Sequence, residues 1–228
     1  MECSTKSNNK ISMEVGVLII STGKYDVFLQ PLAESIAKHF LLAHEVTIFS
    51  FGDKNCKFHM DHKPFPYPTL MRYHQFNKQK DELSKMDYLF YCDVDMLFVR
   101  DIGSEILSDG LTACIHPYSE SRSFKNTFEL NKNSTAYTED IDTYCCGGFQ
   151  GGTSEAFLRM SEQIAMAIDI DLQNGIVARW HDETHYNKYL TINKPSKILS
   201  RDYCTPEKER NIDSKLLALD KEHEEIRN

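Results

Sequence analysis

The sequence predicts an α/β protein in which helices cover a mainly parallel sheet. Short apolar runs of strand length alternate with amphipathic stretches of helical period, which is the pattern of parallel strands joined by helices. The chain has 228 residues, of which 41% are hydrophobic, so it can form one large domain or two small ones around a core. No apolar run approaches the ~20 residues of a membrane span, and we expect no such span.

The first half of the chain contains three predicted strands. Residues 14–22 form a buried strand that ends at Gly23, residues 45–51 a second strand and residues 87–92 a third. The helix after the first strand has Asp26 as its N-cap. Its inward face is predicted to carry Leu32, Ile36, Ala37, Phe40 and Leu41. Residues 52–68 contain three prolines and predict a loop, and one helix is predicted for residues 70–86.

The second half is arranged around a glycine-rich segment. Residues 111–116 predict another strand, and the polar residues 119–142 predict a long functional loop. Two glycine pairs flank Phe149-Gln150 at a spacing that differs from a G-x-G-x-x-G dinucleotide motif. Glycines there allow the backbone to approach a ligand or a neighbouring strand. A helix follows from Thr153, and the tail from Pro206 is charged and weakly patterned.

The charge balance argues against a general nucleic-acid binder. The 26 basic and 34 acidic side chains leave a formal charge of −8, whereas nucleic-acid binding needs a basic surface. Residues 1–12 are polar and lack the apolar segment of a secretory signal, so we expect a cytoplasmic protein. The seven cysteines are then expected to be free thiols in a reducing compartment.

An Asp-x-Asp tripeptide occurs three times, and one copy has the context of a binding site. The copies are Asp93/Asp95, Asp140/Asp142 and Asp169/Asp171. The third lies on a predicted helix, where residues two apart point in nearly opposite directions, and the second lies in a polar loop. The first follows a strand, where ligands of α/β sheets bind. Its carboxylates suit Mn²⁺ or Mg²⁺, which can bridge a diphosphate. The ordinary alternative is an acidic turn after a strand.

The segment Trp180-His181-Asp182-Glu183-Thr184-His185 is the densest in reactive side chains. One interpretation takes His181 and His185 as zinc ligands four residues apart on a helix, although no third ligand stands out downstream. A second makes Asp182 and Glu183 an acid/base or electrostatic pair beside Trp180, whose ring can stack on a sugar. The ordinary alternative is a helix N-terminus with capping carboxylates.

These motifs, in their order, closely resemble glycosyltransferase family 6. This family includes the histo-blood-group A and B transferases, the α1,3-galactosyltransferases and small bacterial relatives. The segments that carry the resemblance are residues 21–25, 87–96, His116-Pro117, residues 147–152, residues 180–183, residues 187–190, Lys194-Pro195 and Leu199-Ser200. The resemblance runs from about Met13 to Asn228 and is far more specific than any single motif.

The resemblance implies a single GT-A domain, with a mixed, mainly parallel sheet flanked by helices. It implies a polar N-terminal tail at residues 1–12, a catalytic domain at residues 13–205 and a C-terminal lid over the donor site at residues 206–228. The implied activity is the transfer of galactose or N-acetylgalactosamine from UDP-Gal or UDP-GalNAc to the 3-hydroxyl of a β-galactoside oligosaccharide, with retention of the α configuration.

The resemblance also implies roles for individual residues. Tyr25 corresponds to the aromatic residue on uracil, with Thr22 beside it. Asp93 and Asp95 correspond to the metal and diphosphate motif, with Val94 at the ribose. The other implied donor contacts are Arg72, Cys146, Gly147, Gly148, Asp182, Lys221 and Arg227. The implied acceptor contacts are His116, Thr127, Trp180 and Glu183, and Glu183 also corresponds to the catalytic carboxylate at the anomeric carbon.

Three departures from the family pattern bear on these expectations. We expect none of the membrane helix that anchors mammalian members, as in small soluble bacterial relatives, and those relatives often have Asn-x-Asn. Because this chain retains both aspartates, we expect dependence on Mn²⁺, with Mg²⁺ as the other candidate ion. Cys146 and Gly148 are small at the positions that choose the donor sugar, which favours UDP-GalNAc over UDP-Gal. Pro206 stands where the blood-group enzymes have an acidic acceptor contact.

Two other functions stay open on the sequence alone. One is a zinc-dependent hydrolase that uses His181 and His185. The other is a catalytically inert module that binds a nucleotide sugar.

Overall fold

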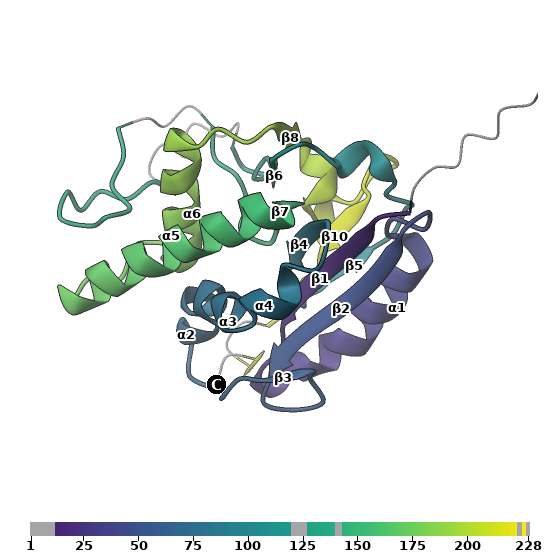
Figure 1. The fold of residues 1–228 in the computed structure, drawn as a ribbon, viewed down its shortest axis with the longest axis horizontal. Helices are drawn as coiled ribbons and strands as arrows, with labels where there is room; N and C mark the ends of the chain where they lie inside the picture. Colours follow the sequence, from purple (N-terminus) through teal and green to yellow (C-terminus); the bar gives the residue numbers. More distant parts are fainter. Residues whose placement is uncertain (1–11, 120–126, 140–142, 223–224, 227–228) are drawn as a thin grey trace, which may run out of the picture.

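The computed structural model describes residues 12–119, 127–139, 143–222 and 225–226. Its centre is a seven-stranded sheet with strand order β3-β2-β1-β4-β7-β6-β8 (Figure 1). The strands are β1 (Glu14–Ile20), β2 (Glu45–Gly52), β3 (Phe58–His59), β4 (Tyr88–Cys92), β6 (Leu111–Cys114), β7 (Phe149–Thr153) and β8 (Lys197–Leu199). β7 is antiparallel to both of its neighbours, and the other pairings are parallel. The predicted α/β class with a mixed, mainly parallel sheet is confirmed.

Helices cover both faces of this sheet. They are α1 (Leu29–His39), α2 (Tyr67–Leu70), α3 (Arg72–Lys78), α4 (Lys80–Leu83), α5 (Ser154–Gln173) and α6 (His181–Ile192). Alternate residues of β1 point to opposite faces: Val17 packs in the core formed with Leu32 of α1, and Leu18 in the core formed with Phe157 of α5. This explains why β1 is apolar almost throughout. No helix in the described ranges is long and apolar enough to span a lipid bilayer.

A second, three-stranded sheet brings the C-terminal part of the chain to the end of β4. It consists of β5 (Met96–Phe98), β10 (Leu216–Ala218) and β9 (Thr205–Pro206), with β10 in the centre. Beyond β10, the backbone N–H of Leu219 donates to the carbonyl of Asp95 at 2.9 Å. The tail was expected to be weakly patterned, but Leu216 and Leu217 are buried and belong to strand β10. This strand therefore holds the residues that follow it beside Asp95.

Several local predictions are wrong. The single helix predicted for residues 70–86 is interrupted at Met71 and Gln79, where the sequence has neither glycine nor proline, and its last helical residue is Leu83. Asp26 lies inside a 3₁₀ turn (Gly23–Phe28) and does not cap α1, whose N-cap is Phe28. Ala37 is exposed, because the buried face of α1 is formed by Leu32, Ser35 and Ile36. The predicted loop at residues 52–68 contains β3, which pairs with the end of β2.

Candidate active site

The carboxyl ends of β1 and β4 meet beside one cavity. The two strands are parallel neighbours, with Leu18 opposite Tyr91, so the segments that follow them leave the sheet at the same edge. The cavity encloses about 750 Å³, counting its open mouth. Its lining includes six predicted donor residues from three distant segments: Thr22, Tyr25, Asp93, Val94, Asp95 and Lys221. The sheet topology thus brings together residues that are far apart in the sequence.

Asp93 and Asp95 each have one carboxylate oxygen engaged by protein. The Tyr91 hydroxyl donates to Asp93 Oδ1, and Nη1 of Arg72 lies 3.4 Å from the same oxygen. Asp95 Oδ2 forms an ion pair with Lys221. The other two oxygens, Asp93 Oδ2 and Asp95 Oδ1, take part in none of these contacts. Two hard oxygen atoms on the cavity wall therefore remain available to a ligand.

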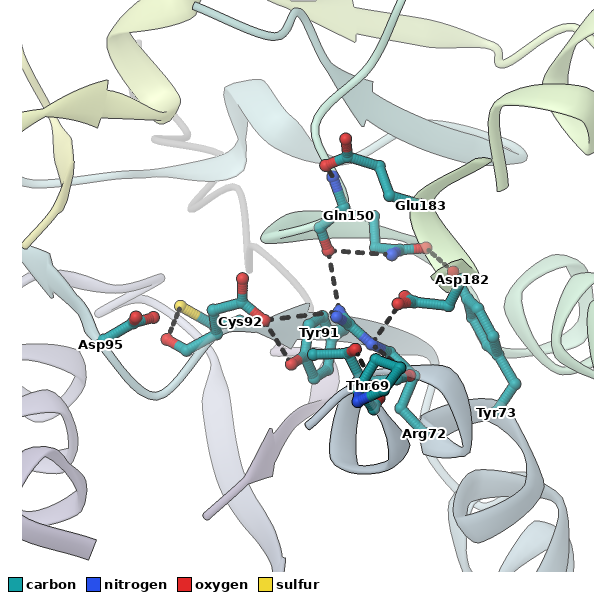
Figure 2. A network of polar contacts seen from close by, with 12 residues as sticks. Thr69, Arg72, Tyr73, Tyr91, Cys92, Asp95, Gln150, Asp182 and Glu183 are labelled. Atoms are coloured by element: carbon teal, nitrogen blue, oxygen red, sulfur yellow. Dashed lines mark hydrogen bonds and ion pairs between the residues drawn. The ribbon is translucent and has the colours of Figure 1, made fainter. Parts of the chain in front are cut away.

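Arg72, the first residue of α3, connects the two acidic motifs from a buried position (Figure 2). Its Nε lies 2.8 Å from Asp182 Oδ2, and its Nη1 donates to the Gly147 carbonyl at 3.1 Å. The guanidinium carbon lies 4.2 Å from the centre of the Tyr91 ring. Burial alone would lower the pKa of Arg72, but the charges of Asp182 and Asp93 raise it, so the guanidinium stays protonated.

Asp182 and Glu183 form the first turn of α6. Burial raises the pKa of Asp182 to about 7, against the opposing effect of Arg72. Desolvation by the surrounding protein raises the pKa of Glu183 to about 8, although two donors stabilise its charged form. These donors are the Gly147 N–H, 2.7 Å from Oε2, and the Tyr144 hydroxyl, 2.8 Å from Oε1. Both carboxyl groups therefore change charge near neutral pH, as acid/base and electrostatic groups of active sites do.

The glycines of the segment before β7 allow it to pass between the two acidic motifs. A Cβ atom at Gly147 would lie 3.2 Å from Glu183 Cβ, and one at Gly148 would lie 2.9 Å from Asp93 Oδ2. Neither position has room for a side chain without a shift of a site carboxylate. Cys146 is buried, and its N–H donates to the Cys114 carbonyl at 2.9 Å.

His116 and the residue after Thr127 pack against Tyr144, whose hydroxyl donates to Glu183. The His116 ring is 5.6 Å from the Tyr144 ring, and burial lowers the pKa of His116. Thr127 precedes Phe128, whose ring meets the Tyr144 ring edge-on at 5.1 Å. Trp180 stands directly before α6 and is 49% exposed, so its indole is accessible to a ligand.

Part of the C-terminal segment lies at the cavity mouth. Lys221 and Ile226 line the cavity, and the Lys221 ammonium lies 5.9 Å from the centre of the Tyr25 ring. The Lys24 ammonium donates to the Glu225 carbonyl at 2.8 Å, which ties this segment to the turn after β1. Arg227, the other predicted cation of the lid, lies outside the described residues.

The residues of the alternative zinc site and of the Asp169/Asp171 pair contact other side chains of the fold. His185 is buried with Nε2 3.6 Å from Asp171 Oδ2, and the ring of His181 meets Phe65 edge-on at 4.9 Å. Asp169 pairs with His74. Across the described residues, no cluster of three or more histidine, cysteine or acidic side chains is arranged to hold a metal ion. Nothing in this part of the chain favours a zinc hydrolase. Asp140 and Asp142 lie outside the described residues.

Some residues of the network were not predicted as site residues. Tyr91 donates to the site carboxylate of Asp93, and Tyr144 donates to that of Glu183. Gln150 donates to the Gly147 carbonyl and accepts a hydrogen bond from the Tyr73 hydroxyl. Tyr91 lies in an apolar strand and Tyr73 in a predicted helix, so no local sequence pattern marks either one as a site residue. Gln150 is the one polar side chain within the glycine-rich strand, and this was a signal that could have been used.

An α/β sheet with paired aspartates at its carboxyl edge, beside a cavity, is typical of nucleotide-binding enzymes. Comparison of the sequence with known proteins defines the class further. The model of glycosyltransferase family 6 matches residues 69–228. The chain is 31% identical to histo-blood group ABO system transferase 1 of Rattus norvegicus over 240 residues, which cover 94% of the chain and 68% of that relative.

Two further relatives extend the comparison. Human globoside α-1,3-N-acetylgalactosaminyltransferase 1 is 31% identical over 214 residues, covering 85% of this chain and 61% of the relative. The O-antigen biosynthesis glycosyltransferase WbnI of Escherichia coli is 29% identical over 227 residues, covering 93% of this chain and 97% of the relative. The chain therefore belongs to glycosyltransferase family 6, as the motifs indicated, and its relatives support glycosyl transfer. Its sheet and flanking helices are consistent with a single GT-A-like domain.

Proposed function

We propose that the protein is a retaining glycosyltransferase that moves N-acetylgalactosamine, or galactose, from a UDP donor to the 3-hydroxyl of a β-galactoside, forming an α1,3 linkage. One observation carries this proposal: buried Arg72 joins Asp93, on the cavity wall, to Asp182 beside Glu183. A leaving diphosphate at Asp93 and a reacting sugar at Glu183 would then lie on opposite sides of one guanidinium. The α-1,3-N-acetylgalactosaminyl transfer named for a relative supports the choice of donor and linkage.

The cavity suits the nucleotide half of the donor. Tyr25 would stack on the uracil next to Thr22, and Val94 would contact the ribose. Lys221 would bind the diphosphate once the donor displaces it from Asp95, and a cation over a leaving diphosphate stabilises the charge that develops there. Arg227 is proposed for the same role.

The residues present fit a divalent ion. Mg²⁺ and Mn²⁺ favour hard oxygen ligands and are commonly held by one or two carboxylates together with substrate phosphates. Asp93 and Asp95 each keep one oxygen outside their contacts with protein, and they lie on the wall of the cavity in which we propose that the diphosphate binds. We propose that these two residues hold Mn²⁺, or Mg²⁺ in its place. When bound, the ion would neutralise charge on the departing UDP.

Glu183 is proposed as the catalytic carboxylate. Its two oxygens are held by the Tyr144 hydroxyl and the Gly147 N–H, so the group is oriented before substrate binds. In its ionised form it would stabilise positive charge at the anomeric carbon as the bond to UDP breaks. Asp182, held by Arg72, would accept hydrogen bonds from donor hydroxyls. His116, Thr127 and Trp180 would contact the acceptor, and the small residues Cys146 and Gly148 would leave room for an N-acetyl group.

The test is a panel of UDP-sugars with Mn²⁺ and lactose-type acceptors, scored for UDP release and for the linkage of the product. We expect UDP-GalNAc to be the better donor and the product to be α1,3-linked. Glu183→Gln should lower turnover by several orders of magnitude while UDP binding persists. Glu155→Gln is the matched control, because Glu155 also lies in the first turn of a helix but is exposed. Binding of UDP-GalNAc without UDP release by the wild-type protein would instead indicate an inert nucleotide-sugar-binding module.

A further inference from the structure

Gln150 is a polar side chain in the middle of the sheet and is not explained by the fold. It lies in β7 opposite Tyr91 of β4 and is 1% exposed. Its Nε2 donates to the Gly147 carbonyl at 3.1 Å, and its Oε1 accepts from the Tyr73 hydroxyl at 2.9 Å (Figure 2). A carbonyl can only accept, so the amide nitrogen must face Gly147 and the amide oxygen must face Tyr73. Burial of a primary amide costs free energy that an apolar side chain would not, so a role beyond packing is indicated.

Gly147, whose carbonyl Gln150 holds, lies between the two acidic motifs. The N–H of Gly147 donates to Glu183 Oε2 at 2.7 Å. On the other side, the carbonyl of Gly148 accepts from the backbone N–H of Asp93 at 2.8 Å. Two consecutive glycines have a wide choice of backbone conformations and no side chains to hold them in place. Their geometry must therefore be set by hydrogen bonds from neighbouring residues.

Gln150 is the second donor to the Gly147 carbonyl, beside Arg72, and helps to define its orientation. Nη1 of Arg72 donates to the same Gly147 carbonyl at 3.1 Å, so that carbonyl would keep a partner without Gln150. Two donors on one carbonyl, however, define its orientation, since each occupies one lone pair. Both constraints come from adjacent residues at the start of α3, directly from Arg72 and through Gln150 from Tyr73.

We propose that Gln150, braced by Tyr73, is a positioning residue that keeps the Gly147 N–H on Glu183. This inference rests on the proposed function of Glu183. Gln150 does not line the donor cavity, so it acts on the reacting group only through Gly147. Its loss should impair the chemical step and leave donor binding unchanged.

The principal test compares Gln150→Met with the wild-type protein. Methionine keeps the length and volume of the side chain but cannot donate or accept as the amide does. We expect kcat to fall about 10- to 100-fold and the KM for the donor to stay within about 2-fold, because a small displacement of a catalytic group affects turnover rather than binding. Tyr73→Phe, which removes only the hydrogen bond to Gln150, should lower kcat in the same way but by a smaller factor. Gln163→Met, an exposed site on α5, is the matched control and should behave as wild type.

A second readout separates positioning from general loss of structure and does not need turnover. The pKa of Glu183 can be followed by NMR titration of its carboxyl carbon in each variant. The Gly147 N–H lowers this pKa, so a misplaced N–H should raise it, by about half a unit or more in Gln150→Met. The other titratable groups that act on Glu183 are Tyr73, Tyr144, Cys145, Cys146, Asp182 and Cys204, and none of them is altered in this variant.

The outcomes are distinct. A folded Gln150→Met protein with an unchanged Glu183 titration, or with a changed KM and normal kcat, overturns the inference. If the wild-type protein releases no UDP from any donor, the proposed function fails. The titration of Glu183 still shows whether Gln150 keeps the Gly147 N–H in position on Glu183. A raised pKa of Glu183 in Gln150→Met, together with the smaller fall in kcat in Tyr73→Phe, supports the inference, and the control variant must leave both unchanged.

Discussion

Arg72 and Asp182 form a buried ion pair, with Nε 2.8 Å from Oδ2 and both side chains almost fully removed from solvent. The Nε proton is also directed to the Thr69 carbonyl at 3.3 Å, so the contact with Asp182 is mainly one of charge. A charge of either sign left alone in this position would be costly, because the surrounding protein solvates it poorly. The pair therefore makes α3 and α6 depend on each other at the site.

Arg72→Met should destabilise the fold by about 3–5 kcal/mol, since it leaves Asp182 and Asp93 without their shared cation. Adding Asp182→Asn to this variant should restore part of the loss, because the uncompensated charge is removed. Urea unfolding of the two single variants and the double variant measures the coupling. Strictly additive losses would contradict the pairing.

Stability should fall as pH rises from about 5 to 8 because of Glu183. Its pKa is about 8 in the folded protein and near 4.5 when unfolded, so over this range the folded state binds a proton that the unfolded state has released. The folded state is thus favoured at low pH, and the advantage is lost as pH rises through the folded pKa. The pKa of Asp182 is about 7 in the folded protein against 3.8 when unfolded, so Asp182 acts in the same direction.

The variant that isolates this effect is Glu183→Gln, which cannot titrate. Relative to wild type it should gain stability between pH 5 and pH 8, on the order of 1–3 kcal/mol. Chemical unfolding at several pH values measures the difference, and Glu155→Gln should show none. A stability difference that is independent of pH would mean that Glu183 has an ordinary pKa.

Removal of metal should abolish most of the proposed transfer. EDTA should suppress turnover and Mn²⁺ should restore it, whereas Asp93→Asn and Asp95→Asn should lose the response to Mn²⁺, since an amide is a poorer ligand for a hard cation. Full activity in EDTA would contradict the proposed metal site. Lys208→Met, at a surface ion pair with Asp220, is a suitable unaffected control.

Lys221 should compete with the metal ion before donor binds. Its ammonium pairs with Asp95 Oδ2, one of the proposed ligand groups. Lys221→Met should therefore bind Mn²⁺ about 3- to 10-fold more tightly in the absence of UDP and bind UDP more weakly in its presence. Electron paramagnetic resonance of free Mn²⁺ measures the first effect and calorimetry the second. Equal Mn²⁺ affinity in the two proteins would refute the competition.

Two glycines in the same segment should respond differently to alanine. At Gly148 the added Cβ would meet the Asp93 carboxylate at 2.9 Å, a movable group, so Gly148→Ala should fold but weaken Mn²⁺ and UDP binding about 10-fold. At Gly151 it would lie 2.2 Å from the Phe90 ring and 2.6 Å from the Leu89 carbonyl, so Gly151→Ala should cost ~3 kcal/mol of stability. Urea unfolding and UDP titration distinguish the two outcomes.

Several elements were predictable because their signals are local. The apolar runs that became β1, β2, β4 and β6 have strand length, and Thr153 caps α5 by accepting from the N–H of Ala156 at 3.4 Å. The division of residues 70–86 at Gln79 and the formation of β10 had no such signal. Both depend on which side chains the rest of the fold can bury.

The sequence alone determined the α/β class, the acidic motifs and the glycine segment, since each depends on residue type and spacing over a few positions. Only the tertiary structure decided that Arg72 joins Asp93 to Asp182, that Tyr144 and Gly147 hold Glu183, and that β10 delivers Lys221 to Asp95. These contacts join residues up to 126 positions apart, as the Asp95–Lys221 pair shows. Their energies come from burial and charge in three dimensions, and no short stretch of sequence contains them.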